Sequence, residues 1–163
     1  MRENEDGADF LPMRLVTVLV VASLVLVSAA VYAMEAVRQS SKEAARSCMS
    51  TIIAVAETEY TESSPGLGDG AIVDVLVPAN VCNMTFGATG ADEDSQIECS
   101  TACSILYADG TEERYLAGMP LCPGSPGTGK GGPLVLCPGR YSISISTGEI
   151  NGRPVVMIYA EGK

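Results

Sequence analysis

LVTVLVVASLVLVSAAVY, residues Leu15 to Tyr32, is the stretch that decides the fold. It contains no charged residue, and its only polar interruptions are Thr17, Ser23 and Ser28. An apolar run of roughly 18 residues or more is long enough to cross a hydrocarbon core of about 30 Å as a helix. The stretch therefore predicts a membrane-spanning helix near the N-terminus.

The helical pattern continues past this apolar run. The next segment, AMEAVRQSSKEAARSCMSTIIAVAETEY, has no glycine or proline and is rich in good helix formers. One unbroken helix from Met13 to about Tyr60 would be roughly 70 Å long at 1.5 Å per residue. We expect a leader-like cytoplasmic segment at 1–12, a transmembrane and stalk helix at 13–60, a linker at 61–70 and an extracellular β domain at 71–163.

A cleaved secretory signal is the alternative interpretation of the apolar run. Signal peptides have a shorter apolar region, of about 7–15 residues, after a basic segment. Here the preceding MRENEDGADFLPMR holds more acids than bases, although the sequence from Ala29 to Ala33 imitates a cleavage site. Basic residues flank the run on both sides, so the positive-inside rule gives no clear orientation. We place the C-terminal part outside the cell on the cysteines and a glycosylation sequon.

Beyond Tyr60 the pattern changes from helical to strand-like. TESSPGLGDG, residues 61–70, is rich in helix breakers. Asp109-Gly110 and Asn151-Gly152 are typical hairpin turns between β-rich segments. The expected strands are 71–77, 81–86, 96–107, 111–116, 134–137, 140–146 and 154–159. These short strands predict a small antiparallel β-sandwich, so the expected fold is an α+β lollipop with a helix followed by a sandwich.

Composition argues against several functional classes. The 163 residues carry a net charge of −10 and include no His. Nucleic acid is an unexpected partner, because phosphate binding needs a patch of Lys and Arg. The chain also lacks the most common general base and metal ligand. We expect no enzymatic activity and no cofactor.

Two loop motifs resemble ligand sites without completing them. Gly124 to Lys130 matches the front of a phosphate-binding loop, but Gly131-Gly132-Pro133 follows in place of a Ser or Thr and a helix. We interpret it as a Gly/Pro loop. The cluster Asp92-Glu93-Asp94 could offer oxygens to Ca²⁺, but its spacing matches no complete calcium loop. A solvated loop is the preferred interpretation.

Cysteines are dense in the expected β domain. A Cys99-x3-Cys103 pair is close to zinc-ligand spacing, but no second close pair and no His complete a site. We favour disulfides, because small extracellular domains are often cross-linked; buried free thiols are the alternative. Cys99 and Cys103 should not pair with each other, since strand geometry holds them about 13 Å apart. The disulfide candidates are Cys82, Cys99, Cys103, Cys122 and Cys137.

Asn83-Met84-Thr85 is an N-x-T sequon, which makes Asn83 a candidate glycosylation site if it is exposed outside the cell.

The helix offers two candidate packing faces. Small residues allow helices to approach closely in membranes, and Ala22 and Ala29 are seven residues apart, as are Ser23 and Ala30. A second set of mostly apolar residues recurs every three or four positions along the stalk, on one face of the helix. This spacing is typical of a helix that packs against another surface. Whether that surface is the chain's own β domain or a second subunit stays open. This stalk row comprises Met34, Val37, Ser41, Ala45, Cys48, Ile52 and Val55. The opposite face should be exposed to water. It carries Glu35, Arg38, Lys42, Glu43 and Arg46.

The layout resembles archaeal type IV pilin-like proteins, the group with class III signal peptides. Three features carry the resemblance: GADFLPMRL at residues 7–15, the helix ending in a Tyr60…Ser64-Pro65-Gly66 linker, and PLVLCPGRYSISIS at residues 133–146. At the processing site Gly7 follows Asp6, where that family usually has a basic residue. The resemblance implies a helix packed into a filament core and a β domain facing outward.

Two functions follow as hypotheses. The first is a structural subunit of a cell-surface filament, whose partners are the membrane and copies of itself or related pilin-like subunits. The second is a monomeric, single-pass anchored ectodomain that binds a ligand or surface protein.

Overall fold

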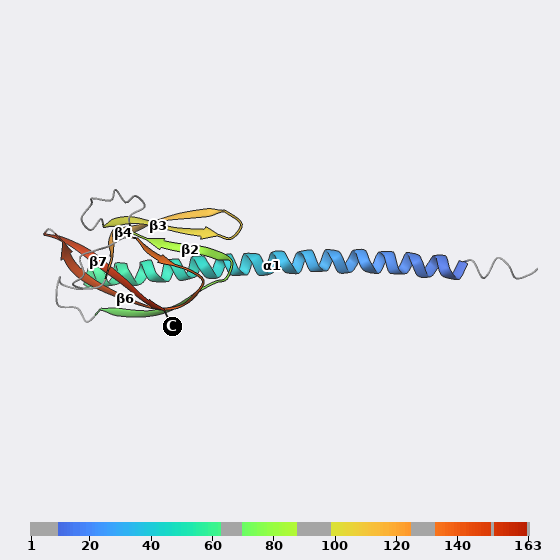
Figure 1. Ribbon diagram of the computed structural model, residues 1–163, viewed down its shortest axis with the longest axis horizontal. Coiled ribbons are helices and arrows are strands. Elements are labelled where there is room, and N and C mark those ends of the chain that lie inside the picture. Colours follow the sequence, from blue (N-terminus) through green and yellow to red (C-terminus); the bar gives the residue numbers. More distant parts are fainter. Residues whose placement is uncertain (1–9, 63–69, 88–98, 125–132, 151, 163) are drawn as a thin grey trace, which may run out of the picture. The chain divides into compact units, whose positions relative to one another are not determined.

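A computed structural model describes residues 10–62, 70–87, 99–124, 133–150 and 152–162. It contains one long helix followed by a seven-stranded mixed β-sheet (Figure 1). The chain divides into two compact units, one up to Ser40 and one from Ser41 onward. The division falls inside the helix, and each unit is described by itself below.

The helix, α1, is continuous from Phe10 to Glu62. It contains the window Met13 to Tyr60 that the sequence predicted, because no glycine and no mid-helix proline interrupts the hydrogen bonding there. The prediction of one unbroken helix is confirmed.

Each of the seven expected segments corresponds to an observed strand. The strands are β1 (Ala71–Val77), β2 (Val81–Phe86), β3 (Ser100–Tyr107), β4 (Glu112–Pro123), β5 (Leu134–Leu136), β6 (Gly139–Ile150) and β7 (Arg153–Gly162). Of these, β4 and β6 extend well beyond the predicted ends at residues 116 and 146. Both predicted hairpins form, since β3 pairs antiparallel with β4 and β6 with β7. Gly110 and Gly152 adopt φ values of 81° and 75°, which explains why glycine occupies these turns.

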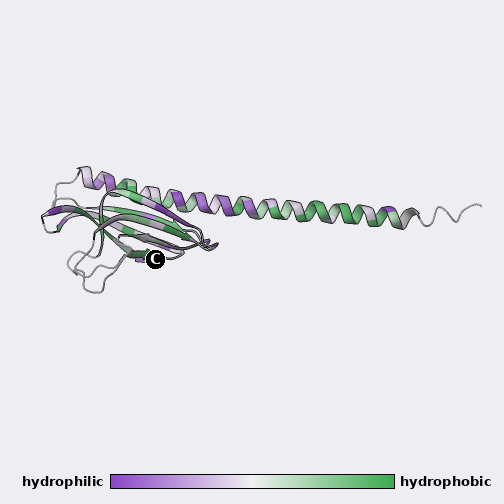
Figure 2. Cartoon of the chain, turned by 90° about the horizontal axis from the view of Figure 1, so that it is seen from above, coloured by the Kyte–Doolittle hydropathy of each residue, from purple (hydrophilic) through white to green (hydrophobic). Residues whose placement is uncertain are grey.

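The expected antiparallel sandwich is not what the described strands form. All seven join one sheet in the order β1-β6-β7-β4-β3-β2-β5, and β4 pairs with β7 in parallel. The second layer of the domain is the part of α1 from Ser41 onward instead of another sheet, as Figure 2 shows. Burial explains this outcome: Ala45, Met49, Ile52 and Ala56 of α1 are fully buried in the same core as the sheet. A helix with this apolar face removes the need for a second sheet.

The core lies between the last turns of α1 and one face of the sheet. Alternation decides which strand residues enter it: in RYSISIS, Ile143 and Ile145 are fully buried, as the period of two predicts. Tyr107 and Phe86 are the largest buried side chains. This core belongs entirely to the unit that begins at Ser41.

Several predicted features lie outside the described residues. They are the segment 1–9, most of the 61–70 linker, the acidic cluster Asp92-Glu93-Asp94, and the phosphate-loop-like string after Gly124.

Candidate functional site: the apolar half of the helix

The N-terminal half of α1 exposes a large apolar surface. Every side chain from Met13 to Ser40 is exposed. Its best window has a mean hydropathy of 2.6 and none of that window is buried, so the helix is long and apolar enough to cross a membrane. Figure 2 shows the apolar colouring concentrated on this half. Exposed apolar area costs about 25 cal/mol per Å² in water, so this surface requires lipid or protein cover. A membrane anchor and a signal sequence both meet this description.

The hydroxyls within the apolar run are satisfied by the helix itself. Thr17 Oγ1 donates to the Met13 carbonyl at 2.9 Å, and Ser28 Oγ donates to the Leu24 carbonyl at 2.8 Å. Ser23 Oγ donates to the Val20 carbonyl, also at 2.8 Å. A polar group without a partner would be costly in hydrocarbon. The three interruptions of the apolar run are therefore compatible with an apolar environment.

The predicted helix-packing residues lie within this half. Ala22, Ser23, Ala29 and Ala30 are all exposed on α1. The hydroxyl of Ser23 is engaged inside its own helix, so Ser23 offers mainly its small size to a neighbour. Their role in packing against a second helix stays a prediction.

The stalk row divides between two environments. Ala45, Cys48 and Ile52 are buried against the chain's own sheet, and Val55 packs at the edge of this core. Ser41 Oγ bonds to Asn80 Oδ1 at 2.6 Å, where the loop between β1 and β2 meets the helix. Self-docking therefore accounts for this part of the row. Met34 and Val37 continue the row but remain 73% and 70% exposed.

Two residues of the predicted wet face are in fact bonded to the sheet. Lys42 Nζ lies 2.8 Å from Asp109 Oδ2, and 4.9 Å from the centroid of the Tyr107 ring. It also donates to Thr111 Oγ1 at 3.3 Å. The hydrogen bonds from Lys42 and Thr111 lower the pKa of Asp109 well below its ordinary value. Lys42 thus holds the β3–β4 turn against the helix.

Arg46 forms the second link, one helical turn further on. Its Nε lies 2.9 Å from Glu113 Oε2, and its Nη2 lies 2.5 Å from Oε1. Glu113 also accepts hydrogen bonds from the hydroxyls of Tyr115 at 2.8 Å and Tyr107 at 3.2 Å. These bonds, led by the one from Arg46, lower the pKa of Glu113 to about 2. Burial, reinforced by Glu113, raises the pKa of Tyr107 to about 12.

The ion pairs of Lys42 and Arg46 with Asp109 and Glu113, called the polar cluster below, join the helix to the sheet and do not form a reactive site. A carboxylate held ionised by three donors is a poor proton acceptor, since protonation would forfeit those bonds. Arg46 is exposed, as predicted, while Lys42 is partly buried, and the sequence did not identify Glu113 as their neighbour. One signal was present: two bases four residues apart on the helix and two acids four residues apart near the predicted Asp109-Gly110 turn. Sequence spacing could not show that the two pairs face each other.

The cysteines fall into three groups. Cys99 and Cys122 form a disulfide with their Cα atoms 4.5 Å apart, so the prediction of at least one disulfide is confirmed. Cys99 is not bonded to Cys103, also as predicted. Cys48 and Cys103 are buried thiols, and burial raises the pKa of Cys103 to about 11. Cys82 and Cys137 are exposed thiols.

Other candidate chemistry is sparse in the described part of the chain. There, no three His, Cys, Asp or Glu side chains come together as a metal site. An open hollow beside β1 and β6 is lined by Asp74, Val75, Leu76, Arg140 and Tyr141, and its Asp74 accepts a hydrogen bond from Ser142 at 2.9 Å. Asn83 is half-buried on β2, and its glycosylation stays a prediction.

Among the described residues, the exposed apolar half of α1 is thus the surface that most needs to be covered by lipid or protein. The polar cluster and the disulfide stabilise the domain that follows it. Comparison with known proteins adds no family to this picture, because no protein-family model, curated protein or solved structure matches the chain.

Proposed function

We propose that this chain is a structural subunit of a pilin-like cell-surface filament. In this proposal the apolar half of α1 sits in the membrane before assembly and then packs against copies of itself or a related subunit. The β domain faces outward. The resemblance of the sequence to archaeal type IV pilin-like proteins supports the proposal, and one structural observation favours it over a bare anchor.

That observation concerns Met34 and Val37. Both are apolar, both are more than two-thirds exposed, and both continue the row that the sheet buries further along α1. They lie beyond Leu15–Tyr32, among the charged residues Glu35 and Arg38. Charged side chains prefer the aqueous or headgroup region to the hydrocarbon, so lipid tails are a poor cover for this part of the helix. A neighbouring helix would bury the two side chains.

The two proposed roles make different demands on these positions. An anchor needs only the apolar run, and the surface beyond the membrane is free to vary. A filament subunit needs this surface apolar, because a charge buried in a helix interface without a partner is strongly unfavourable. The anchored ectodomain that binds a ligand or surface protein is therefore the outcome if the surface proves tolerant.

The experiment replaces both residues in the native cell, as Met34→Glu with Val37→Glu. The matched control is Ala36→Glu with Gln39→Glu, which adds the same charges at the same spacing on an opposite face of the helix that is also exposed. Membrane extraction by alkaline carbonate measures insertion. Mass identification of the chain in sheared surface material measures assembly.

Both variants should insert as the wild type does, because neither alters Leu15–Tyr32. The Met34/Val37 variant should lose assembly by about tenfold or more, since the loss of even 1.4 kcal/mol per contact is tenfold in an equilibrium constant. The control should assemble normally. Equal assembly of both variants, or absence of the wild-type chain from sheared material, would reject the filament subunit and favour the anchored ectodomain.

A further inference from the structure

Two exposed cysteines occupy neighbouring strands at one edge of the sheet. Cys82 lies on β2, and Cys137 follows directly after β5, the edge strand that pairs with β2. The other four cysteines are accounted for by the Cys99–Cys122 disulfide and by burial of Cys48 and Cys103. The exposed pair therefore calls for its own explanation.

The strand register brings the two residues close together. β2 and β5 pair antiparallel, with Met84 opposite Leu136 and Thr85 opposite Val135. Extending this register one residue past the end of β5 would set Asn83 opposite Cys137 and make Cys82 a diagonal neighbour. A strand spacing of about 5 Å and a rise of about 3.3 Å give a Cα separation of roughly 6 Å. Disulfides bridge Cα separations of about 4.4–6.8 Å.

A β-bulge in β2 turns Cys82 to the exposed side of the strand. Strict alternation would put Cys82 on the inner face with Met84, which is fully buried. The register of β2 against β3 shifts between Val81 and Asn83, so Val81 is buried and Cys82 is exposed. On β5, Leu136 is buried while Val135 and Cys137 are exposed. Both thiols thus point outward from adjacent strands.

The geometry points to a second disulfide, between Cys82 and Cys137, that fastens strand β5 to the sheet. Each thiol gives up one proton and one electron as the S–S bond forms. A disulfide-bearing oxidant, either an oxidoreductase or an oxidised small thiol, accepts the two protons and two electrons and is reduced to two thiols. The inference is independent of filament assembly and requires only that the domain folds where such an oxidant is present.

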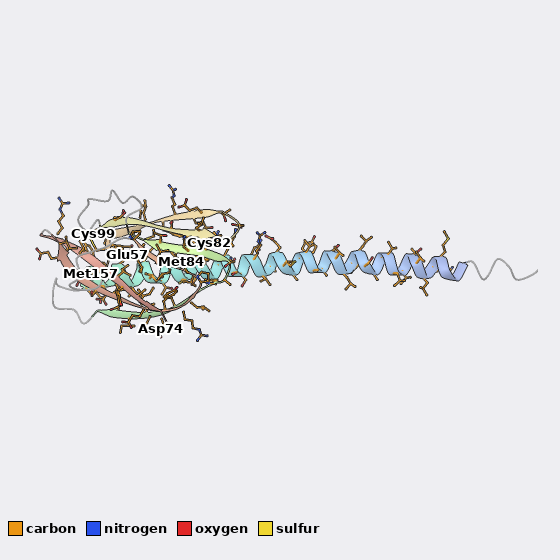
Figure 3. The ribbon with its side chains drawn as sticks, in the orientation of Figure 1. Glu57, Asp74, Cys82, Met84, Cys99 and Met157 are labelled. Carbon is orange, nitrogen blue, oxygen red and sulfur yellow. A yellow bond between two sulfur atoms is a disulfide. The ribbon has the colours of Figure 1, made fainter. Side chains whose placement is uncertain are left out.

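The bridge would secure a weak part of the domain. β5 has only three residues and pairs with β2 at three positions, at one edge of the sheet. Figure 3 shows Cys82 and Cys99 toward opposite ends of the domain, so the second bridge would complement the one at Cys99–Cys122. Edge strands are prone to open and pair with other chains, and a covalent link to β2 would oppose this.

Peptide mapping of the full chain tests the inference. Protein from the native membrane fraction is incubated with oxidised glutathione, alkylated, and digested without reduction by trypsin and a Glu-specific protease. The sequence then places Cys82 in peptide 63–93 and Cys137 in peptide 131–140, apart from every other cysteine. The expected product is a 63–93 to 131–140 cross-link. Recovery of the cross-link between 99–112 and 115–130 shows that existing disulfides survive the procedure.

Three results would overturn the inference: alkylated thiols at both residues, glutathione adducts at both residues, or a link from either residue to a second chain. A thiol titration of the folded protein supplies an independent readout. Cys82→Ser should release the thiol of Cys137 and raise the count of reactive thiols by one. The matched control, Cys103→Ser, removes a buried thiol and should leave that count unchanged. Without the bridge both exposed thiols would react in the wild type, and Cys82→Ser would lower the count by one. A count that falls or stays equal in Cys82→Ser would therefore contradict the bridge.

Discussion

Arg46 of α1 and Glu113 of β4 face each other in a two-point ion pair, with Nε 2.9 Å from Oε2 and Nη2 2.5 Å from Oε1. The pair joins the helix to the sheet at a position where Tyr107 and Tyr115 also donate to the same carboxylate. It shows that α1 beyond Ser41 is an integral layer of the domain. The polar side of this part of the helix forms ion pairs with the sheet and its turn, and the apolar side packs against the core face of the sheet.

Protonation of Glu113 should destabilise the domain in a defined pH window. The folded-state pKa of about 2 lies below the ordinary value of 4.5, so the stabilisation is present above about pH 4.5 and is lost as the pH falls toward 2. Glu113→Gln should lower the free energy of unfolding at pH 7 by about 1 kcal/mol, allowing for solvent screening of a partly exposed pair. The substitution should also reduce the change in the free energy of unfolding between pH 4.5 and pH 2.

Chemical denaturation of the full chain in detergent micelles at several pH values measures this effect. The control is Glu112→Gln on the same strand, which removes an exposed carboxylate paired with Arg114. The free energy of unfolding of Glu113→Gln should still fall somewhat as the pH is lowered, because the pKa of Asp109 is also lowered in the folded protein. An acid profile identical to that of the wild type would show that the Arg46–Glu113 pair contributes nothing to folding.

Gly87, which directly follows β2, should tolerate a side chain poorly. Its φ is +89°, and a Cβ placed there would lie 2.5 Å from Pro123 Cγ. Gly110 has a similar φ of +81° but no atom within 4 Å of such a Cβ. Gly110→Ala should therefore cost only the left-handed strain, about 1 kcal/mol. Gly87→Ala should cost about 1–3 kcal/mol more from overpacking. Denaturation midpoints of the two variants measure the difference, and equal losses would contradict the clash.

The Cys99–Cys122 bridge should contribute about 3 kcal/mol to the free energy of unfolding, since it closes a loop between residues 23 apart. The comparison is made in a Cys82→Ser, Cys137→Ser background, so that only this bridge can form. Adding Cys99→Ser and Cys122→Ser should lower the melting temperature measured by circular dichroism. A reductant should produce the same loss in the background protein and no further loss in the quadruple variant. A reductant effect that survives without the two cysteines would show another cause.

Bulk added to the small residues of the apolar run should impair assembly without impairing insertion. Ala22→Leu with Ala29→Leu fills positions where a neighbouring helix would approach closely, while Leu favours the bilayer at least as well as Ala. The control, Val20→Phe with Val27→Phe, adds similar volume about 160° around the helix. Carbonate extraction and the sheared fraction report the two properties. Assembly that is normal in the first variant and lost in the control would place the packing face elsewhere.

Local sequence patterns alone determined much of this protein. The absence of glycine and of mid-helix proline specifies a continuous helix, since each residue adds its own backbone bond to the preceding turn. The alternation in RYSISIS buries Ile143 and Ile145, and Asp109-Gly110 closes a hairpin. These features depend on neighbours within a few residues, so sequence spacing is sufficient to predict them.

Only the tertiary structure decided which surfaces meet. The stalk row required burial, but an apolar face does not specify its partner, and the sheet covers Ala45, Cys48 and Ile52 while leaving Met34 and Val37 exposed. The same limit explains why the predicted sandwich is not confirmed: the helix, and not a second sheet, covers the core face of the described strands. Arg46 and Glu113 meet because strand order and register bring distant segments together. Contacts of that kind depend on the whole fold, and no local spacing encodes them.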